Sequence, residues 1–166
     1  MSDDNSFGSF EDFVALLDYP MFIVTVRAGD QLGGCLVGFA SQASINPPAF
    51  LVGLSRLNHT LTLAYDCTHL AVHVVAKENF GLAELFGGET NDRINKFEHC
   101  AWYSGPHGLP ILAAAEGWFV GEVVGRFDMG DHVGHLLRPQ SARVSGSPRP
   151  AVSSHDAAHI TPGHPA

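Results

Sequence analysis

Apolar and polar residues alternate along several stretches of the chain, and this pattern predicts strands. Alternation bounded by turn-forming residues is typical of half-buried strands. Tight turns are expected at residues 28–31 and 128–131, and Gly130 in the second turn is free to adopt positive φ. The predicted strands cover residues 21–28, 33–39, 49–55, 70–76, 118–127 and 132–138.

Short stretches with helical spacing accompany these strands. The first predicted helix begins at Ser9, which forms a capping pattern with Asp12, and it ends before Pro20. Its apolar residues share one face: Phe10, Phe13, Val14 and Leu17. Further short helices are expected at residues 60–65, 79–86 and 92–97.

Strands therefore dominate the expected fold. They are not regularly interleaved with long helices, so a doubly wound parallel sheet is disfavoured. A small antiparallel barrel with helices at its ends fits better, because barrel closure removes exposed sheet edges. Glycines inside the predicted strands support this fold, since barrel corners need them: Gly34, Gly38, Gly53, Gly121 and Gly125.

The composition indicates one folded domain followed by a tail. Of the 166 residues, 45% are hydrophobic and 16% are charged, which supplies enough apolar material for one sizeable core. We expect this domain to cover residues 1–139. Residues 140–166 are rich in Pro, Ser, Ala and His without an apolar period, so they are predicted to form a flexible tail.

The formal net charge of -8 argues against a broad surface for nucleic acid or anionic lipid, so neither is an expected partner. No apolar run is long enough to span a bilayer, and the acidic start is unlike a secretory signal. The 3 cysteines form no short-spaced pair, which is typical of free thiols in a reducing compartment. We therefore expect a cytoplasmic protein.

Motifs for hydrolysis and metal binding are missing from the sequence. It contains no nucleophile elbow, no Walker loop, no dinucleotide-binding glycine motif and no H-E-x-x-H. His69 and His73 would share a strand face near Cys67, but no carboxylate accompanies them. His132 and His135 would point to opposite faces of a strand. No metal site is expected.

Three segments carry residues suited to a nucleotide-like ligand. Residues 38–48 combine small and hydrogen-bonding residues with a rigid Pro-Pro, although an ordinary polar turn is the alternative. Arg56 precedes a predicted helix, where charge, donors and the helix dipole suit a phosphate monoester; a capped helix with a surface arginine is the alternative. At residues 130–132 an aspartate can orient the following histidine, as it also does in many ordinary turns.

In combination, these segments resemble the flavin reductase-like family, the FMN-binding split-barrel domains. The resemblance covers residues 19–139 and implies a mainly β fold, a split antiparallel β-barrel of about six strands with short flanking α-helices. It rests on a strand that follows Pro20, the run Ser44-Ile45-Asn46-Pro47-Pro48, a strand at 50–54 with Asn58 and Thr60 after it, the strand at 70–74, the segment 108–112, and Gly130-Asp131-His132.

The resemblance implies an NAD(P)H-dependent flavin reductase. In such a protein a homodimer holds FMN or FAD at its subunit interface, and NADH or NADPH delivers hydride from nicotinamide C4 to flavin N5. The reduced flavin then passes to oxygen or to an oxygenase component. His132 would help to seat the nicotinamide nucleotide, and no catalytic acid or base is expected. The positions that match the flavin-binding motifs are Gly38, Phe39, Ala40, Ser41, Gln42, Ser44, Ser55, Arg56, Asn58 and Thr60.

One departure from the family pattern concerns residues 36–40. Many members read Thr-Val-Ser-Ser-Phe there, whereas this chain reads Leu-Val-Gly-Phe-Ala and loses two hydroxyls. The choice among FMN, FAD and a deazaflavin therefore stays open, although a deazaflavin tail would call for more cations near Arg56. A flavin- or haem-binding split-barrel module without reductase turnover is the alternative from another functional class.

Overall fold

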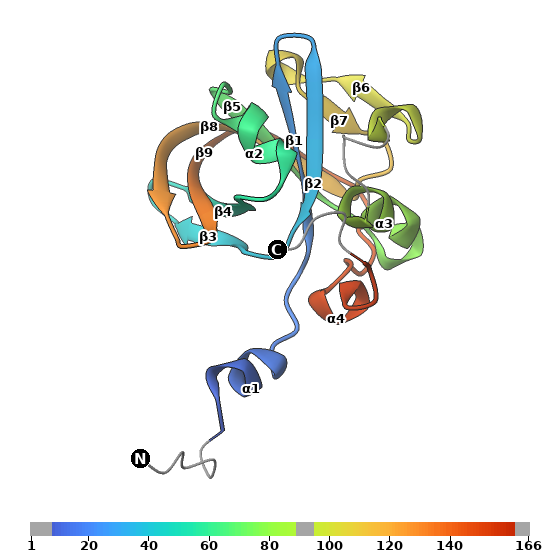
Figure 1. The fold of residues 1–166 in the computed structure, drawn as a ribbon. Coiled ribbons are helices and arrows are strands. Elements are labelled where there is room, and N and C mark those ends of the chain that lie inside the picture. The colour runs from blue at the N-terminus through green and yellow to red at the C-terminus, as the bar shows by residue number, and fades with distance from the viewer. Residues whose placement is uncertain (1–7, 89–94, 162–166) are drawn as a thin grey trace.

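An antiparallel sheet of seven strands forms the body of the protein, in a computed structural model that describes residues 8–88 and 95–161 (Figure 1). The strand order is β2-β1-β5-β8-β9-β4-β3, and two further strands, β6 and β7, pair separately. The strands are β1 (Phe22–Ala28), β2 (Gln31–Val37), β3 (Ala40–Ser44), β4 (Ala49–Ser55), β5 (His69–Val74), β6 (Trp102–Ser104), β7 (Pro110–Leu112), β8 (Gly117–Asp128) and β9 (His132–Val144).

The sheet curls into a barrel that stays open between its edge strands β2 and β3. Among the described residues no ladder joins these two edges, so the barrel is split. Side chains that alternate inward along the strands form the main core, which includes Val24, Val52, Leu70 and Leu137. The predicted mainly β split barrel is confirmed.

Short helices accompany the barrel, and α1 lies apart from it (Figure 1). They are α1 (Phe10–Ala15), α2 (His59–Ala64), α3 (Phe80–Gly88) and α4 (Ser154–Ala157), with 3-10 turns η2 (Lys77–Asn79), η3 (Lys96–Glu98) and η4 (Pro106–Gly108). Helix α2 packs on β1, β2 and β4 and buries Leu61 and Leu63 in the main core. Helix α1 begins with the predicted capping box of Ser9 and Asp12 and buries none of its residues. No helix in the described ranges is long and apolar enough to cross a membrane.

The imidazole of His73 ties three strands together in the interior. Its Nδ1 lies 3.0 Å from the Ile23 carbonyl oxygen on β1, and the Leu112 amide of β7 donates to its Nε2 at 3.1 Å. These contacts assign the neutral tautomer that donates from Nδ1. Burial lowers the pKa of His73 to about 4, because the interior disfavours the charged ring.

The C-terminal residues differ from the expected flexible tail as far as residue 161. Strand β9 continues past residue 139 to Val144, and Val152 is buried in a second core beside Ile23 and Phe86. The Met21 amide donates to the Val152 carbonyl oxygen, which extends the pairing of β1. A few apolar residues among the prolines and serines therefore suffice to dock this segment. Residues 162–166 lie outside the described ranges.

The six predicted strands are confirmed, but the described structure holds three more. Strand β3 has the sequence Ala-Ser-Gln-Ala-Ser, which lacks an apolar alternation, and it forms only because β4 supplies its hydrogen-bonding partner. Strands β6 and β7 have three residues each, too few to show a period. Most of the helix predicted at 92–97 lies outside the described residues, and η3 occupies residues 96–98.

Candidate functional site

The strand register brings parts of all three candidate segments to one face of the sheet. Ser41 lies opposite Leu51, Gly53 opposite Gly134, and Ser55 opposite His132. Side chains at directly opposite positions of antiparallel strands point to the same face. We call the surface formed by these six residues, which faces away from the main core, the outer face.

A floor without side chains lies at the centre of the outer face, where Gly53 pairs with Gly134. The Gly53 amide donates to the Phe39 carbonyl oxygen at 2.7 Å. A Cβ atom on Gly53 would lie 3.3 Å from atoms of Phe39 and Met129, and one on Gly134 would lie 2.5 Å from Met129 Sδ. The flexible Met129 side chain thus lies over bare backbone, and a planar ring could take its place.

Phe39 and His132 stand at the edge of this floor. Their ring centroids are 4.7 Å apart with an interplanar angle of 53°. The Nδ1 atom of His132 lies 2.7 Å from Asp131 Oδ1, so the carboxylate orients the imidazole, as the sequence predicted. This hydrogen bond lowers the pKa of Asp131. Phe39 is half-exposed, so part of its ring is accessible to a ligand.

The guanidinium of Arg56 lies at the rim of the outer face. Its Nε donates to the Gly130 carbonyl oxygen at 2.7 Å, and its Nη2 donates to Asp128 Oδ1 at 2.8 Å. This hydrogen bond lowers the pKa of Asp128 and raises that of Arg56. The Arg56 side chain is 43% exposed, so a phosphate can reach it, but an incoming phosphate has to compete with Asp128.

The other candidate residues between 55 and 60 stabilise the start of helix α2. Asn58 is its N-cap, and Asn58 Oδ1 accepts from the Thr60 amide at 2.9 Å. Ser55 Oγ accepts from the Leu57 amide at 3.3 Å. Thr60 is 1% exposed, so its hydroxyl is not available at the surface. The segment therefore presents Ser55 and Arg56 at the outer face and places Thr60 in the core.

The first segment is divided between the two faces of the sheet. Ala40 lies opposite Val52 and Gln42 opposite Phe50, so both point away from the outer face. The side-chain nitrogen Nε2 of Gln42 donates to the Ser44 carbonyl oxygen at 3.2 Å. A Cβ on Gly38 would lie 3.1 Å from side-chain atoms of Tyr19 and Met21, so Gly38 allows the N-terminal segment to approach. Of this segment, Ser41 belongs to the outer face and Phe39 stands at its edge.

Gln42 instead lines an apolar pocket of about 460 Å³. Four aromatic side chains form part of its wall: Phe22, Phe50, Trp118 and Phe119. The Phe50 ring contacts the other two phenylalanines edge-on, with centroids 5.5 Å from Phe22 and 5.2 Å from Phe119. Its walls come from β1, β3, β4, β5, β8 and β9 and from the segment after β9. Sequence reasoning missed this pocket because its residues are dispersed along the chain and form no local motif.

The cysteine and histidines of the disfavoured metal cluster lie in separate environments. Cys67 Sγ lies 3.1 Å from the Arg27 carbonyl oxygen, while His73 is held inside the sheet. His69 stacks on His107, with ring centroids 3.5 Å apart. Within the described residues, no group of three or more His, Cys, Asp or Glu side chains could hold a metal ion.

Residues 14–159 match the family model of the flavin reductase like domain. This range includes the outer face, the pocket and most of the C-terminal segment. A relative described as FMN reductase (NADH) RutF 2, from Rhizobium rhizogenes, is 32% identical over 115 residues, which are 67% of this chain and 64% of that protein.

Two further proteins resemble this chain over different shares of their lengths. The reductase component of a flavin-dependent trigonelline monooxygenase, from Acinetobacter baylyi, is 26% identical over 86% of this chain and 44% of its own length. The chain thus spans less than two thirds of either relative. A solved structure of an FMN-binding protein from Thermus thermophilus shares the fold, with a TM-score of 0.83 at 20% identity, over 100% of this chain and 97% of that one.

Proposed function

Because this chain belongs to the flavin reductase-like family, we propose that it is an NAD(P)H:flavin oxidoreductase that binds FMN or FAD on its outer face. The single observation that carries the proposal is the convergence of Phe39, Arg56 and His132 around the Gly53–Gly134 floor. The flavin ring, its phosphate and the nicotinamide nucleotide would each contact a suitable group there.

Different residues on and around the outer face bind different parts of the flavin in this proposal. The backbone floor at Gly53 and Gly134 supports the isoalloxazine ring, and Ser41 offers a hydroxyl beside it. Arg56 attracts the phosphate, with Ser55 next to it on the face. Asn58 contributes indirectly, because it caps the helix whose N-terminus follows this loop. The buried Thr60 is left out of this assignment.

The chemistry that a flavin supplies when bound is acceptance of hydride at N5 from nicotinamide C4. The protein then has to align and shield the two rings rather than supply an acid or base. His132, held by Asp131 and packed against Phe39, seats the nicotinamide nucleotide over the floor. Its position next to the half-exposed ring of Phe39 supports this role.

A homodimer forms part of the proposal. The outer face and the loops around it expose several large apolar side chains, and such a patch is typical of an interaction surface. They are Phe39, Ile45, Leu57, Phe127 and Met129. A second copy would cover them and exclude water from the flavin. The proposed acceptor of the reduced flavin is oxygen or an oxygenase component, as the name of the Acinetobacter relative suggests.

An absorption spectrum of the purified protein, followed by an NADH and NADPH oxidation assay with added FMN or FAD, tests the proposal. We expect either a flavin spectrum or nucleotide oxidation that depends on added flavin. Folded protein that shows neither would overturn the proposal. Stoichiometric flavin or haem binding without nucleotide oxidation would favour the binding module instead.

A further inference from the structure

A second exposed arginine, Arg126, lies at the C-terminal end of helix α2. Its Nη2 donates to the carbonyl oxygens of Ala64 and Cys67, at 2.9 and 3.0 Å. These two bonds hold the guanidinium in one place. Its Nε and Nη1 donate to no group within the described residues, so the donors on these two nitrogens remain available to a ligand.

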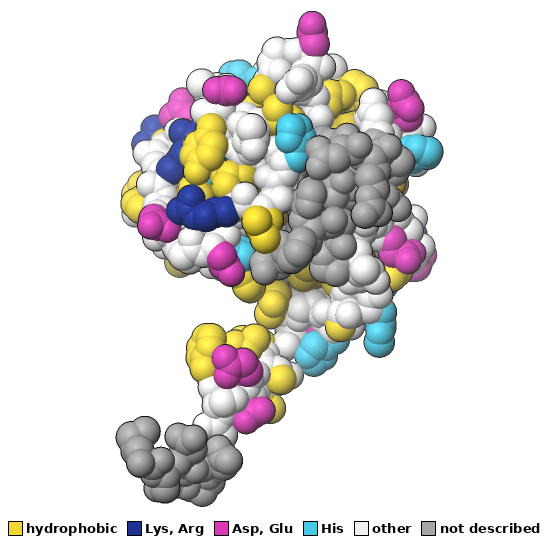
Figure 2. Space-filling view, viewed as in Figure 1, with side chains coloured by type: hydrophobic (Ala, Val, Ile, Leu, Met, Phe, Trp, Pro, Cys, Tyr) yellow, Lys and Arg dark blue, Asp and Glu magenta, His cyan; other side chains and the backbone are white. Residues whose placement is uncertain are grey.

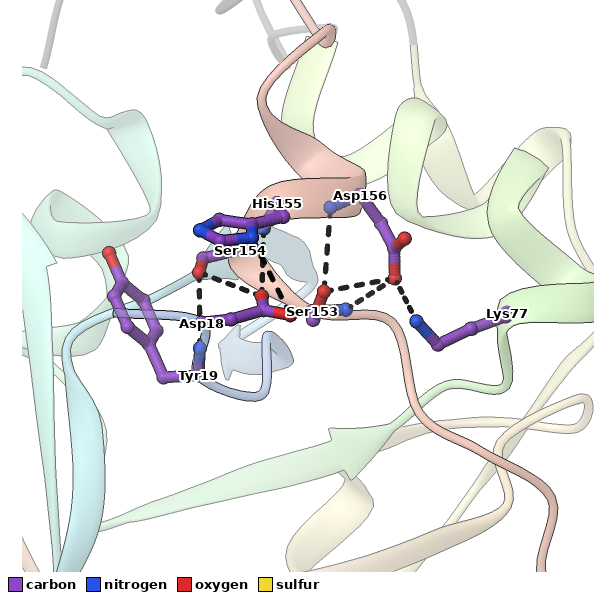
Figure 3. A network of polar contacts seen from close by, with 7 residues as sticks. All are labelled: Asp18, Tyr19, Lys77, Ser153, Ser154, His155 and Asp156. Carbon is purple, nitrogen blue, oxygen red and sulfur yellow. Dashed lines mark hydrogen bonds and ion pairs between the residues drawn. The ribbon is translucent and has the colours of Figure 1, made fainter. Parts of the chain in front are cut away.

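The charge of Arg126 has no counter-ion in residues 8–88 and 95–161, since no carboxylate there forms an ion pair with it. Several other cations of this acidic chain are paired. Figure 3 shows Lys77 bound to Asp156, at 2.9 Å, and Arg149 pairs with two glutamates. Lys and Arg side chains gather over β8 and β9, the hairpin that carries Arg126 (Figure 2). The charge of Arg126 is thus free to attract an anionic ligand.

Two acidic residues stand close to Arg126 in the chain or next to its partners. Asp128 is occupied by Arg56, at 2.8 Å, and by the Gly130 amide, at 3.0 Å. Asp66 is exposed, and in the part of the chain that the structure describes it pairs with neither arginine. Water and salt screen an exposed, unpaired carboxylate, so Asp66 weakens the positive charge here without cancelling it.

Tyr65 connects the two arginines. The Arg126 guanidinium lies over its ring, with Cζ 5.9 Å from the ring centroid, which is within cation–π range. The pKa of Arg56 is raised first by its hydrogen bond to Asp128 and, to a smaller extent, by Tyr65, so the Tyr65 hydroxyl lies near Arg56. Tyr65 is 50% exposed. It therefore offers an aromatic surface between two positive charges.

This group of three side chains continues the outer face beyond its rim. Arg126 lies opposite His135, which is next to the glycine floor on β9, so Arg126 leaves the sheet on the side away from the floor. Arg56 stands at the rim, and Tyr65 lies between Arg56 and Arg126. A ligand that extends past the flavin phosphate would meet Arg56, Tyr65 and Arg126 in that order.

We propose that Arg56, Tyr65 and Arg126 bind the adenylate half of FAD, and that they select FAD over FMN. FAD carries a second phosphate, a ribose and adenine beyond the single phosphate of FMN. The two arginines bind the diphosphate through charge-assisted hydrogen bonds, and adenine packs on the exposed part of the Tyr65 ring. This assignment rests on the proposed function and adds to it the identity of the flavin and the residues that choose it.

Isothermal titration calorimetry with riboflavin, FMN and FAD tests the selection. We expect the wild-type chain to bind FAD at least about fivefold more tightly than FMN. Arg126→Gln removes the charge and keeps a side chain that can donate to the carbonyls at the end of α2. We expect it to lower FAD affinity roughly tenfold and to change FMN and riboflavin affinity less than about twofold. Unchanged FMN binding also shows that the variant is folded.

Arg143→Gln is the matched control. Arg143 is exposed on the same strand pair, lies opposite Trp118 at the far end of β8, and forms no ion pair among the described residues. The substitution removes the same charge at a distance from Tyr65. We expect all three flavin affinities to stay within about twofold of wild type, which separates a local contact from the net charge of the chain.

Two substitutions at Tyr65 test the stacking surface. Tyr65→Leu removes the ring, and we expect FAD affinity to fall at least about threefold while FMN affinity is kept. Tyr65→Phe keeps the ring and loses the hydroxyl, so FAD affinity should stay within about twofold of wild type. If both variants bind FAD like wild type, adenine does not pack on this ring and the proposal is overturned.

Other results would also overturn the selection. They are equal affinity of the wild type for FMN and FAD, an unchanged FAD affinity in Arg126→Gln, and an equal loss for all three flavins in that variant. A raised KM for NADH at saturating FMN, with FAD affinity unchanged, would assign Arg126 to the nicotinamide nucleotide instead. If no flavin binds the wild type, the proposed function fails and this subsite fails with it. If all three flavins bind with ratios that no variant alters, only the subsite fails.

Discussion

Arg56 and Asp128 are 72 residues apart in the chain, and their side chains meet at 2.8 Å. The contact joins the loop before α2 to the hairpin that carries His132. The Gly130 carbonyl oxygen accepts a second hydrogen bond from Arg56, which fixes the guanidinium against this hairpin. The group proposed to attract the flavin phosphate is therefore held by the element proposed to seat the nicotinamide nucleotide.

Replacing Asp128 by Asn should strengthen FMN binding. The change removes the carboxylate that competes with phosphate for Arg56 while the Gly130 contact remains. Because an exposed ion pair is weak, we expect a gain of roughly two- to fivefold in FMN affinity and little change for riboflavin. Fluorescence titration with both flavins measures this difference, and an equal gain for both would contradict it.

Replacing Arg56 by Ala should weaken FMN more than riboflavin, because only FMN carries the phosphate. The side chain is 43% exposed, so we expect FMN affinity to fall by roughly tenfold, less than the loss of a buried charged contact would cause. Arg138→Ala, at another exposed arginine, is the control and should leave both affinities unchanged. Equal weakening of the two flavins would remove Arg56 from the phosphate site.

Replacing His132 by Ala should raise the KM for NADH with little effect on flavin affinity. The ring packs against Phe39 and is oriented by Asp131, so its loss should affect the nucleotide that we propose to lie over the floor. Asp131→Asn keeps the imidazole but weakens its orientation, and we expect a smaller rise in the same direction. Steady-state kinetics at saturating flavin gives these values. A collapse of flavin affinity would place His132 against the flavin instead.

Acid should destabilise the protein through His73. Its pKa is about 4 in the folded state and about 6.5 in an unfolded chain, so between these values the unfolded state binds more protons. The stabilisation is therefore fully present above pH 6.5 and is lost as the pH falls toward 4, by about 3 kcal/mol. Burial also lowers the pKa of His135, which acts in the same direction.

Urea unfolding at a series of pH values measures this loss. His73→Gln should flatten the dependence in that range, and His155→Gln, at an exposed histidine, should not. If both variants keep the wild-type slope, the loss of stability comes from other groups.

A charge at Val152 should unfold the second core. The side chain is buried beside Ile23 and Phe86, so Val152→Asp leaves a carboxylate without compensation and costs about 3–5 kcal/mol. Ala158→Asp, at an exposed position after α4, is the control and should stay within about 0.5 kcal/mol of wild type. Thermal unfolding of both variants tests whether residues 145–161 are part of the folded domain. If the two variants have similar melting temperatures, residues 145–161 are not part of the folded domain, and the prediction of a flexible tail stands.

The predicted strands and the capping box at Ser9 depend on local chemistry, and for that reason they could be derived from the sequence. Alternation along 49–55 places Val52 and Leu54 inward whatever the neighbouring strand is. The hairpin at 128–131 follows from Gly130, whose φ of 89° is the left-handed conformation that glycine adopts without strain. The family resemblance used the same local runs and their order along the chain.

Other features depend on which distant strands pair and in which register. Ser41 and Gln42 are neighbours in sequence, yet the pairing of β3 with β4 sends one to the outer face and the other into the pocket. The bond between Arg56 and Asp128 and the docking of Val152 against β1 require segments from opposite parts of the chain. The sequence by itself determined six of the strands and the residues that carry chemistry. Only the tertiary structure decided which of those residues meet, because one step in strand register exchanges the two faces of a sheet.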